Sequence, residues 1–378
     1  LIEKTKEYTL ENVAKGYLPQ FALSAKASYQ SDVTELPIKI SGVDIKGMPK
    51  DQYQVMVELQ QNVWDGGGIK VQKKQATAEA DVEKEKLNVD MYALNDRVND
   101  LYFGILLLDE QIKQNTLLQD ELERNYRQIT AYVENGIANQ ADLDAVKVEQ
   151  LNTKQKRVDL VSSRAAYLKM LSLLVGEALS PETVLEKPVP QSMVSAVSEI
   201  RRPELALFDA QGAGLQVQEK ALNVRHLPQF GLFVQGAYGN PGLDMLKNEF
   251  SPYYMAGVRL SWNFGSLYTL KNDRRVIEKK RQQLDNNRDV FLFNTRLEMT
   301  QQDQAIHSLE KQMRDDDEII RLRTNIRKAA EAKVANGTLT VTEMLRELTN
   351  ESLARQSKAI HEIQRLMGIY QLKYTIND

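Results

Sequence analysis

The chain has 378 residues, of which 27% are charged, and its formal net charge is −3. This balance provides no basic surface for nucleic acid, so a nucleic-acid partner is not expected. The absence of cysteine excludes disulfide and zinc-thiolate chemistry and is compatible with an oxidising compartment. No apolar run approaches the roughly 18 to 20 residues of a membrane-spanning helix, so any membrane contact must be made by strands or by a surface.

The sequence contains an internal repeat. Leu18-Pro19-Gln20-Phe21 returns as Leu227-Pro228-Gln229-Phe230, and each copy opens a strand-like segment that leads into a very long helical one. Positions 18 and 227 differ by 209, whereas Gly136 and Gly337 differ by 201. The first copy therefore carries eight extra residues, which we place in a loop at 31–52. Such a duplication predicts a repeat architecture.

Residues 1–17 are expected to form the C-terminal part of a helix. The comparison of the two copies places Leu1 opposite Ala210, inside a helix, so we expect the earlier part of this helix to precede Leu1. No export signal or lipid-modified cysteine can be read from this end.

Two strands are predicted in 18–65 and two in 227–265, because apolar and polar side chains alternate there over about ten residues each. The apolar positions are Phe21, Leu23, Ala25, Ala27 and Tyr29; Tyr53, Val55, Val57 and Leu59; Phe230, Leu232, Val234 and Tyr238; and Tyr254, Ala256, Val258, Leu260, Trp262 and Phe264. A tilted strand crossing a bilayer has this length, with aromatic residues near its ends. A soluble sandwich with one wet face would show the same alternation.

The membrane interpretation has a consequence for assembly. Four strands cannot close a barrel, and open sheet edges are not tolerated in lipid. Several chains would therefore contribute strands to one barrel.

Long helical hairpins are predicted at 66–176 and 266–375. An apolar seam with alternating spacings of four and three residues indicates a coiled coil. It comprises Leu87, Met91, Leu94, Val98, Leu101, Ile105, Leu108 and Ile112, and Leu292, Met299, Ile306, Met313 and Ile320 continue the pattern in the second copy. The first helix of each hairpin, near 68–135 and 268–335, would be on the order of 100 Å long at 1.5 Å per residue.

Each long helix is expected to end at a glycine, Gly136 or Gly337, followed by a returning helix. In both copies an acid, Asp142 or Glu343, follows the glycine by six positions. The helix reversal explains the glycines but not these acids. Between the copies, the proline-rich segment 177–203 reads as a linker, and 204–226 as a helix that precedes the second strand pair.

No residues point to catalysis. His226, His307 and His361 lie far apart and have no partner at ligand spacing, so neither a metal site nor a catalytic histidine is expected. The three glycines 66–68 lack the ending of a phosphate loop and read as a connector. The acidic run 315–317 is expected on a solvated helix face. We predict a protein that is not an enzyme and uses no cofactor.

The strand openings, the glycine-rich entry to a long helix and the glycine turns with their acids resemble, in both copies, the outer-membrane efflux channel family typified by TolC. The resemblance implies a mixed α/β membrane protein. Three chains, with four strands each, would form a twelve-stranded barrel in the bacterial outer membrane, continued by long antiparallel coiled-coil helices as a tunnel across the periplasm. In this family the segment that corresponds to 177–203 lies as a belt around the middle of the tunnel.

The implied function is a passive channel-tunnel for the export of small molecules within a tripartite pump. Its implied partners are its own copies in a homotrimer, a periplasmic membrane-fusion adaptor, an inner-membrane pump of the RND, ABC or MFS type, and outer-membrane lipid. A type I protein secretion duct has the same architecture, and the sequence does not separate the two. A different class, a non-membrane coiled-coil scaffold, would be soluble without detergent.

The resemblance also assigns roles near the two glycine turns. Gly136, Ile137, Gly337, Thr338 and Leu339 match the tip turns that meet the adaptor in this family. A further three positions match the periplasmic gate: Asp142, Glu343 and Arg346. Members of the family carry another acid where this chain has Arg346, so ion pairs with Glu343 could hold the aperture shut. Alternatively, Arg346 simply faces solvent or a neighbouring helix.

Overall fold

The computed structural model describes residues 1–34, 48–189, 198–244 and 247–377. The chain divides into two units, which we call the strand unit (Leu1–Leu87 and Ala206–Arg288) and the hairpin unit (Asn88–Leu205 and Asp289–Asp378). Two long helices, α2 (Gly68–Glu134) and α5 (Leu267–Ala335), contribute to both units. Within the described residues, no helix combines the length and apolarity needed to cross a membrane.

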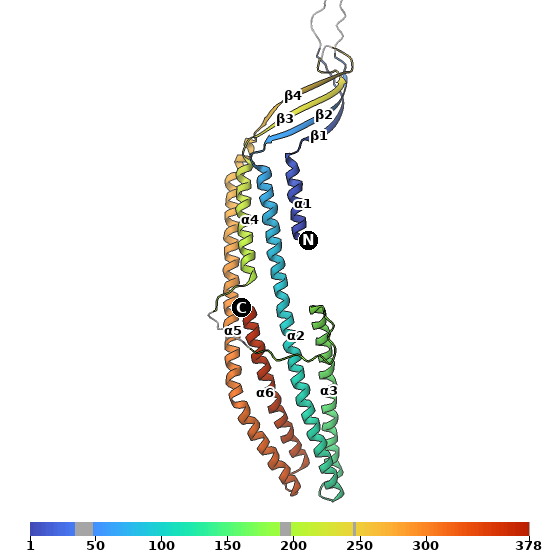
Figure 1. Ribbon diagram of the computed structural model, residues 1–378, viewed down its shortest axis with the longest axis vertical. Coiled ribbons are helices and arrows are strands. Elements are labelled where there is room, and N and C mark those ends of the chain that lie inside the picture. Colours follow the sequence, from blue (N-terminus) through green and yellow to red (C-terminus); the bar gives the residue numbers. More distant parts are fainter. Residues whose placement is uncertain (35–47, 190–197, 245–246, 378) are drawn as a thin grey trace, which may run out of the picture. The chain divides into compact units, whose positions relative to one another are not determined.

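The strand unit contains one antiparallel sheet in the order β1-β2-β3-β4 (Figure 1). Its elements are α1 (Ile2–Ala14), β1 (Gln20–Tyr29), β2 (Asp51–Trp64), α4 (Pro203–Arg225, from Ala206 on), β3 (Gln229–Asn240) and β4 (Ser251–Ser261), with the starts of α2 and α5. The predicted insertion at 31–52 falls largely on 35–47, which lie outside the described residues.

The register of the sheet gathers the apolar side chains onto one face. Two successive cross-strand rows are Phe21, Leu59, Val234 and Ala256, then Leu23, Val57, Gly236 and Tyr254. We call this the apolar face, and the opposite side of the sheet the polar face. The alternation in the sequence therefore corresponds to a real division between two sides of the sheet.

A capped turn joins β2 to α2. The Asp65 carboxylate accepts hydrogen bonds from the backbone N–H groups of Gly67 (2.9 Å) and Ile69 (2.6 Å), which satisfies donors at the start of the helix. Gly66 has φ = +69°, and a Cβ there would lie 2.9 Å from Cβ of Leu227. Both the left-handed backbone and the close approach of Leu227 therefore require a glycine at position 66.

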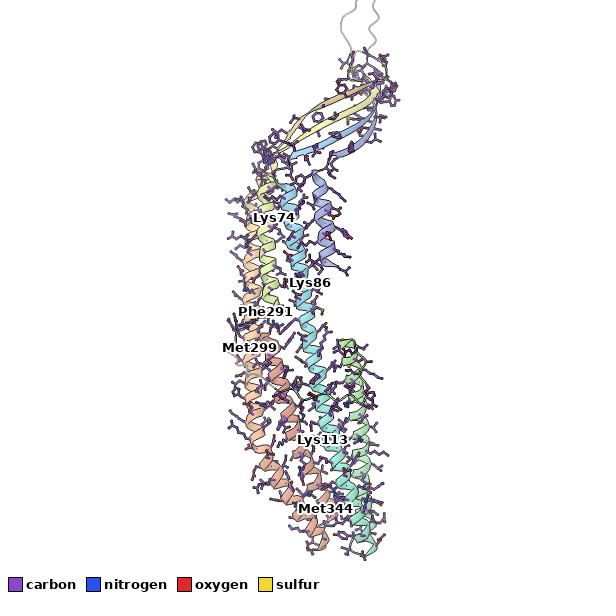
Figure 2. The ribbon with its side chains drawn as sticks, viewed as in Figure 1. Lys74, Lys86, Lys113, Phe291, Met299 and Met344 are labelled. Carbon is purple, nitrogen blue, oxygen red and sulfur yellow. The ribbon has the colours of Figure 1, made fainter. Side chains whose placement is uncertain are left out.

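The hairpin unit holds α3 (Gln140–Val175), α6 (Val341–Ile376) and the remaining lengths of α2 and α5. Leu101 and Ile105, from the predicted seam of α2, pack against Leu168 and Leu171 of α3. A corresponding cluster joins α5 to α6 and contains Met299, Ile306, Ile369, Leu372 and Ile376; Met299 is labelled in Figure 2.

Helix α2 also carries a second buried stripe. Phe103 and Leu106 are each 2% exposed and pack with Ile363 of α6. A seam with a seven-residue period identifies one partner helix. Helix α2 packs against both α3 and α6, so the sequence pattern did not reveal the contact with α6. Met91 of the predicted seam is 57% exposed in the single chain.

The part of the linker that the structure describes, 177–189, lies on the hairpin unit. Its Leu179 and Leu185 pack against the α2–α3 cluster. Arg164 of α3 pairs with Asp109 and donates to the carbonyl oxygens of Pro181 (2.6 Å) and Thr183 (2.7 Å). A single guanidinium thus fixes the linker to two helices through several donors.

Arg202, at the end of the linker, is enclosed by aromatic rings. Its guanidinium lies 5.0 Å from the ring centroids of both Tyr92 and Tyr374 and 5.8 Å from that of Phe291, and it pairs with Glu204. Burial raises the pKa of Tyr92 to about 12, although the nearby Arg202 opposes the change. These contacts hold the start of α4 against α2, α5 and α6 in the hairpin unit.

Candidate functional site

The tip turns have nearly the same backbone in the two copies. Gly136 and Gly337 are left-handed, with φ of +72° and +66°. After each, the next N–H donates to a carbonyl five residues back, from Ile137 to Tyr132 (2.8 Å) and from Thr338 to Lys333 (2.9 Å). This pattern terminates the helix and satisfies carbonyl groups that the helix leaves unpaired.

Capping boxes account for the two acids that follow these glycines. Asn139 accepts from the backbone N–H of Asp142 (3.0 Å), whose carboxylate accepts from the N–H of Asn139 (3.1 Å). Thr340 and Glu343 make the same reciprocal pair at the start of α6 (3.2 Å for each bond). The spacing of six residues is therefore the distance from the helix stop to the third position of the returning helix.

The cap also affects the charge of Glu343. The hydrogen bond from the backbone of Thr340, that from its hydroxyl, and the charge of Arg346 lower the pKa of Glu343. Glu343 is thus held ionised at neutral pH. Arg346 is largely exposed, and Nε lies 3.6 Å from the carboxylate of Glu347. Within one chain, Glu347 is the carboxylate that pairs with Arg346.

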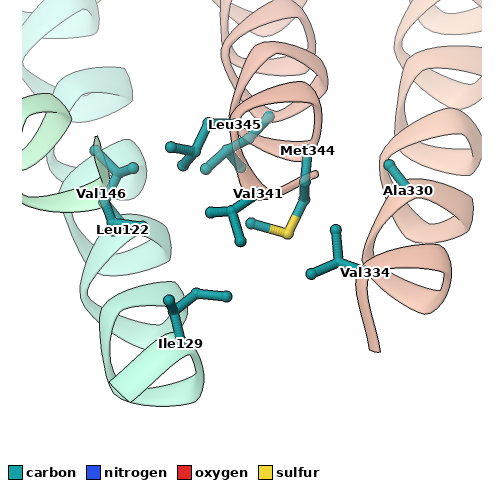
Figure 3. Close-up of a cluster of buried hydrophobic side chains, with 9 residues drawn as sticks. Leu122, Ile129, Val146, Ala330, Val334, Val341, Met344 and Leu345 are labelled. Carbon is teal, nitrogen blue, oxygen red and sulfur yellow. The ribbon is translucent and has the colours of Figure 1, made fainter. Parts of the chain in front are cut away.

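A hydrophobic cluster next to the turns, the tip cluster, joins the two hairpins (Figure 3). It contains Leu122 and Ile129 of α2, Val146 of α3, Ala330 and Val334 of α5, and Val341, Met344, Leu345 and Leu348 of α6. Leu339 packs against the tip cluster, whereas Ile137 is 54% exposed. Of these two predicted adaptor contacts, Ile137 is therefore the one available to a partner.

A charged network that the sequence analysis did not identify lies beside the tip cluster. Glu351 of α6, with a side chain only 6% exposed, pairs with Arg327 of α5 (2.5 Å) and with Arg355 (2.6 Å). Arg327 also reaches Glu121 of α2, at 3.2 Å. We call these residues, with Thr324, the Arg327 network; it connects α2 to α5 and α6. No short spacing in the sequence indicates the Arg327 network, because Glu121 and Glu351 are far from Arg327 along the chain.

The network lowers the pKa of Glu351. Burial acts in the opposite direction, but hydrogen bonds from Arg355, Thr324 and Arg327 outweigh it. The carboxylate is therefore charged at neutral pH and holds two guanidinium groups.

One expectation about a polar residue was wrong. Asp316, expected on a solvated helix face, is 5% exposed and pairs with His361 at 2.9 Å. His226 is 9% exposed, and Nδ1 lies 2.7 Å from the hydroxyl of Ser266. In the part of the chain that the structure describes, no three His, Asp or Glu side chains are placed to hold a metal ion.

The apolar face of the strand unit is left uncovered. Phe21, Leu23, Tyr254 and Val258 are 71% to 82% exposed. Such exposure means that no helix of the described chain covers these side chains. The polar face is the more protected one, and Gly231, Ala237 and Gly239 on β3 are buried there. This is the reverse of the arrangement in a water-soluble sheet.

The chain has the fold of outer-membrane channels. It is similar to VceC of Vibrio cholerae (TM-score 0.70, 11% identity, 99% of this chain and 90% of that chain). It is also similar to the CmeC channel of Campylobacter jejuni (0.68, 12%, 99% and 80%) and to MtrE of Neisseria gonorrhoeae in its open state (0.67, 12%, 99% and 83%). No match was found among curated protein sequences.

Residues 6–177 match the family model described as outer membrane efflux protein. The match covers a little less than half of the chain, and over these residues the chain resembles this family, as its likeness to the TolC-like channels indicated. The family match and the shared fold support an efflux channel of the bacterial outer membrane with a periplasmic helical tunnel; the channels of this family are passive transporters and not enzymes. Channels of the family form trimers and act as components of tripartite efflux systems.

Proposed function

We propose that three copies of this chain form one passive export duct, with a twelve-stranded barrel made from four strands of each copy. The uncovered apolar face carries this proposal. Lipid is the environment in which such a face is stable without a covering layer, and the more protected polar face would then line the lumen.

The edges of the sheet support closure by several copies. Strands β1 and β4 each pair on one side only, because the order is β1-β2-β3-β4. An unpaired edge in a bilayer leaves backbone groups without hydrogen bonds. Pairing of β4 from one copy with β1 of the next satisfies both edges, and three copies give a closed ring of strands.

The hairpin unit supplies the end that meets a periplasmic membrane-fusion adaptor. Ile137 and Thr338 are exposed at the two turns, whereas Gly136 and Gly337 fix the turn geometry and Leu339 supports the tip cluster. The adaptor would connect the duct to an inner-membrane pump of the RND, ABC or MFS type, which would supply the energy.

Asp142, Glu343 and Arg346 would form the periplasmic gate when three copies meet. Arg346 is mostly exposed, so its guanidinium is available to a neighbouring chain as well as to Glu347. Asp142 and Glu343 would serve two purposes, capping their helices and presenting negative charge at the aperture.

The cargo would be small molecules rather than secreted polypeptides. The match to the outer membrane efflux protein model supports this cargo. A type I protein secretion duct, which has the same architecture, is the alternative. The scaffold alternative requires a protein partner to cover the apolar face, because side chains such as Phe21 and Tyr254 are left exposed by the described elements of this chain.

Cross-linking tests the proposed ring directly. The chain has no cysteine, so a cysteine at Ala25 on β1 can be combined in turn with one at Ala256, Val258 or Leu260 on β4. Oxidation of the detergent-purified protein should give dimers and then trimers, but no larger species, for the combination that is in register. Each single-cysteine variant is the matched control and should run as an uncross-linked single chain on a denaturing gel. A ladder beyond three copies, or no cross-link in any combination, would contradict the ring.

A further inference from the structure

The charged residues of the strands, apart from one at a strand end, all lie on the same face of the sheet. Four are present, and Asp51 is the first residue of β2. The other three, Lys26, Glu58 and Arg259, all lie on the polar face. Under the proposed function this face lines the lumen, so every strand charge away from the strand ends would meet the transported solution.

Two of these charges are joined across three strands. The guanidinium of Arg259 on β4 lies 4.9 Å from the ring centroid of Phe233 on β3, and Nη2 lies 3.2 Å from Oε1 of Glu58 on β2. Arg259 therefore crosses over the ring of Phe233 to reach the carboxylate. We call Glu58, Phe233 and Arg259 the three-strand stack.

A glycine makes room for this arrangement. Gly257 is the cross-strand partner of Phe233, and a Cβ at Gly257 would lie 2.9 Å from the Phe233 ring. The ring can lie over β4 because position 257 has no side chain. The ring in turn supports the guanidinium of Arg259 through a cation–π contact. Packing against the Phe233 ring therefore restricts the positions that the Arg259 guanidinium can adopt.

The two charges are not equally accessible. The side chain of Glu58 is 20% exposed and that of Arg259 44% exposed. Oε1 of Glu58 is shielded from solvent and accepts no hydrogen bond in the described structure, so the adjacent guanidinium is what balances its charge. A solute passing over the polar face would thus meet the positive group first.

We propose that the three-strand stack is a selectivity element of the lumen that favours anionic solutes. This inference rests on the proposed trimeric duct, in which three copies would form a ring of three guanidinium groups. The recognised chemistry is a small anion, such as chloride or a carboxylate group carried by the cargo.

Reversal potentials of single channels in a KCl gradient test this inference. A unit charge about 7 Å from a passing ion in water changes its energy by about one RT. Because the change has opposite sign for chloride and for potassium, it corresponds to about a sevenfold change in the permeability ratio of chloride to potassium. Arg259→Gln should lower this ratio about sevenfold, and Glu58→Gln should raise it. Arg259→Lys, which keeps the charge, should stay close to the parent protein.

The double variant with Glu58→Gln and Arg259→Gln is the matched control, because its net charge equals that of the parent. It should return the ratio towards the parent value. Cross-linking of the β1–β4 edges establishes that each variant forms the ring. If Arg259→Gln does not fold, the comparison of the single variants Glu58→Gln and Arg259→Lys with the parent still decides the test. Unchanged ratios in conducting variants would overturn the selectivity role alone. A parent protein that forms the membrane ring but never conducts would overturn the duct and this inference together.

Discussion

The Arg327 network provides a prediction about how the two hairpins are held together. Arg327 is replaced by Met, which keeps much of the side-chain length but removes the charge. The side chains of Arg327 and Glu351 are only 14% and 6% exposed. Breaking a buried pair costs about 3 to 5 kcal/mol, because it leaves a charge without its partner.

The expected loss is smaller than that range because Glu351 keeps two partners. Arg355 lies 2.6 Å and the Thr324 hydroxyl 2.8 Å from its carboxylate. We therefore expect Arg327→Met to lower the free energy of local opening by about 2 to 3 kcal/mol, or about 30- to 150-fold in the opening equilibrium. Faster amide hydrogen exchange should appear in α6 near Glu351 and in α2 near Glu121.

Arg321→Met is the matched control for this experiment. Arg321 lies on the same helix and pairs with Glu318, but both side chains are more than half exposed. We expect no change in exchange there, because exposed ion pairs contribute little to stability. Adding Glu351→Met to Arg327→Met should recover part of the loss, since the buried carboxylate that lost one of its two guanidinium partners is then absent. Equal exchange rates in Arg327→Met and Arg321→Met would refute the reasoning.

Three further predictions concern the turns and the charge of the network. Glu343→Gln should keep the capping box, whereas Glu343→Ala should speed amide exchange in the first turn of α6. If charge closes the gate, both variants should raise the single-channel conductance; if only the cap matters, Glu343→Ala alone should do so. Gly136→Ala and Gly337→Ala should each lower stability by about 1 kcal/mol in thermal unfolding, because φ is positive at both positions. No steric cost is added, since a Cβ would meet nothing within 4 Å. Gly214→Ala, inside α4 with equally open surroundings, is their control and should raise stability by about 0.5 to 1 kcal/mol. Because the pKa of Glu351 is lowered in the folded chain, its stabilising effect should be present above its unfolded pKa of about 4.3 and be lost as the pH falls through the lower folded value. The protection factors of amides near Glu351, which correct for the intrinsic pH dependence of exchange, should therefore fall in acid, and Glu351→Gln should remove that dependence.

The regular parts of the fold could be predicted from the sequence. Alternation with a period of two placed Phe21, Leu23 and Val57 on one face, and the cross-strand register confirms that grouping. The apolar seam and the glycine stops predicted two very long helices, which the structure has at α2 and α5. These features depend on neighbours in the sequence, so local patterns are enough to reveal them.

The interactions that join distant segments could not be predicted in the same way. The second buried stripe of α2, with Phe103 and Leu106, depends on which side of α2 meets α6. The Arg327 network joins residues from three helices, and the enclosure of Arg202 draws on Tyr92 and Tyr374. No short spacing in the sequence encodes such contacts.

The acids after the glycine turns show how a pattern can have a local explanation that spacing alone did not reveal. Asp142 and Glu343 were assigned to the gate through the family resemblance, and their placement at the gate stays a prediction. The structure gives both a capping role within their own helices. Only a variant that separates charge from capping, such as Glu343→Gln, distinguishes the two roles.

Single-channel recording of the detergent-purified protein in a planar lipid bilayer tests the central claim most directly. An oligomeric duct whose periplasmic end is closed at rest predicts discrete unitary steps of small size, and these should increase in variants of the Arg327 network or of Glu343. A protein that remains soluble without detergent and never produces steps would contradict the duct and favour a coiled-coil scaffold.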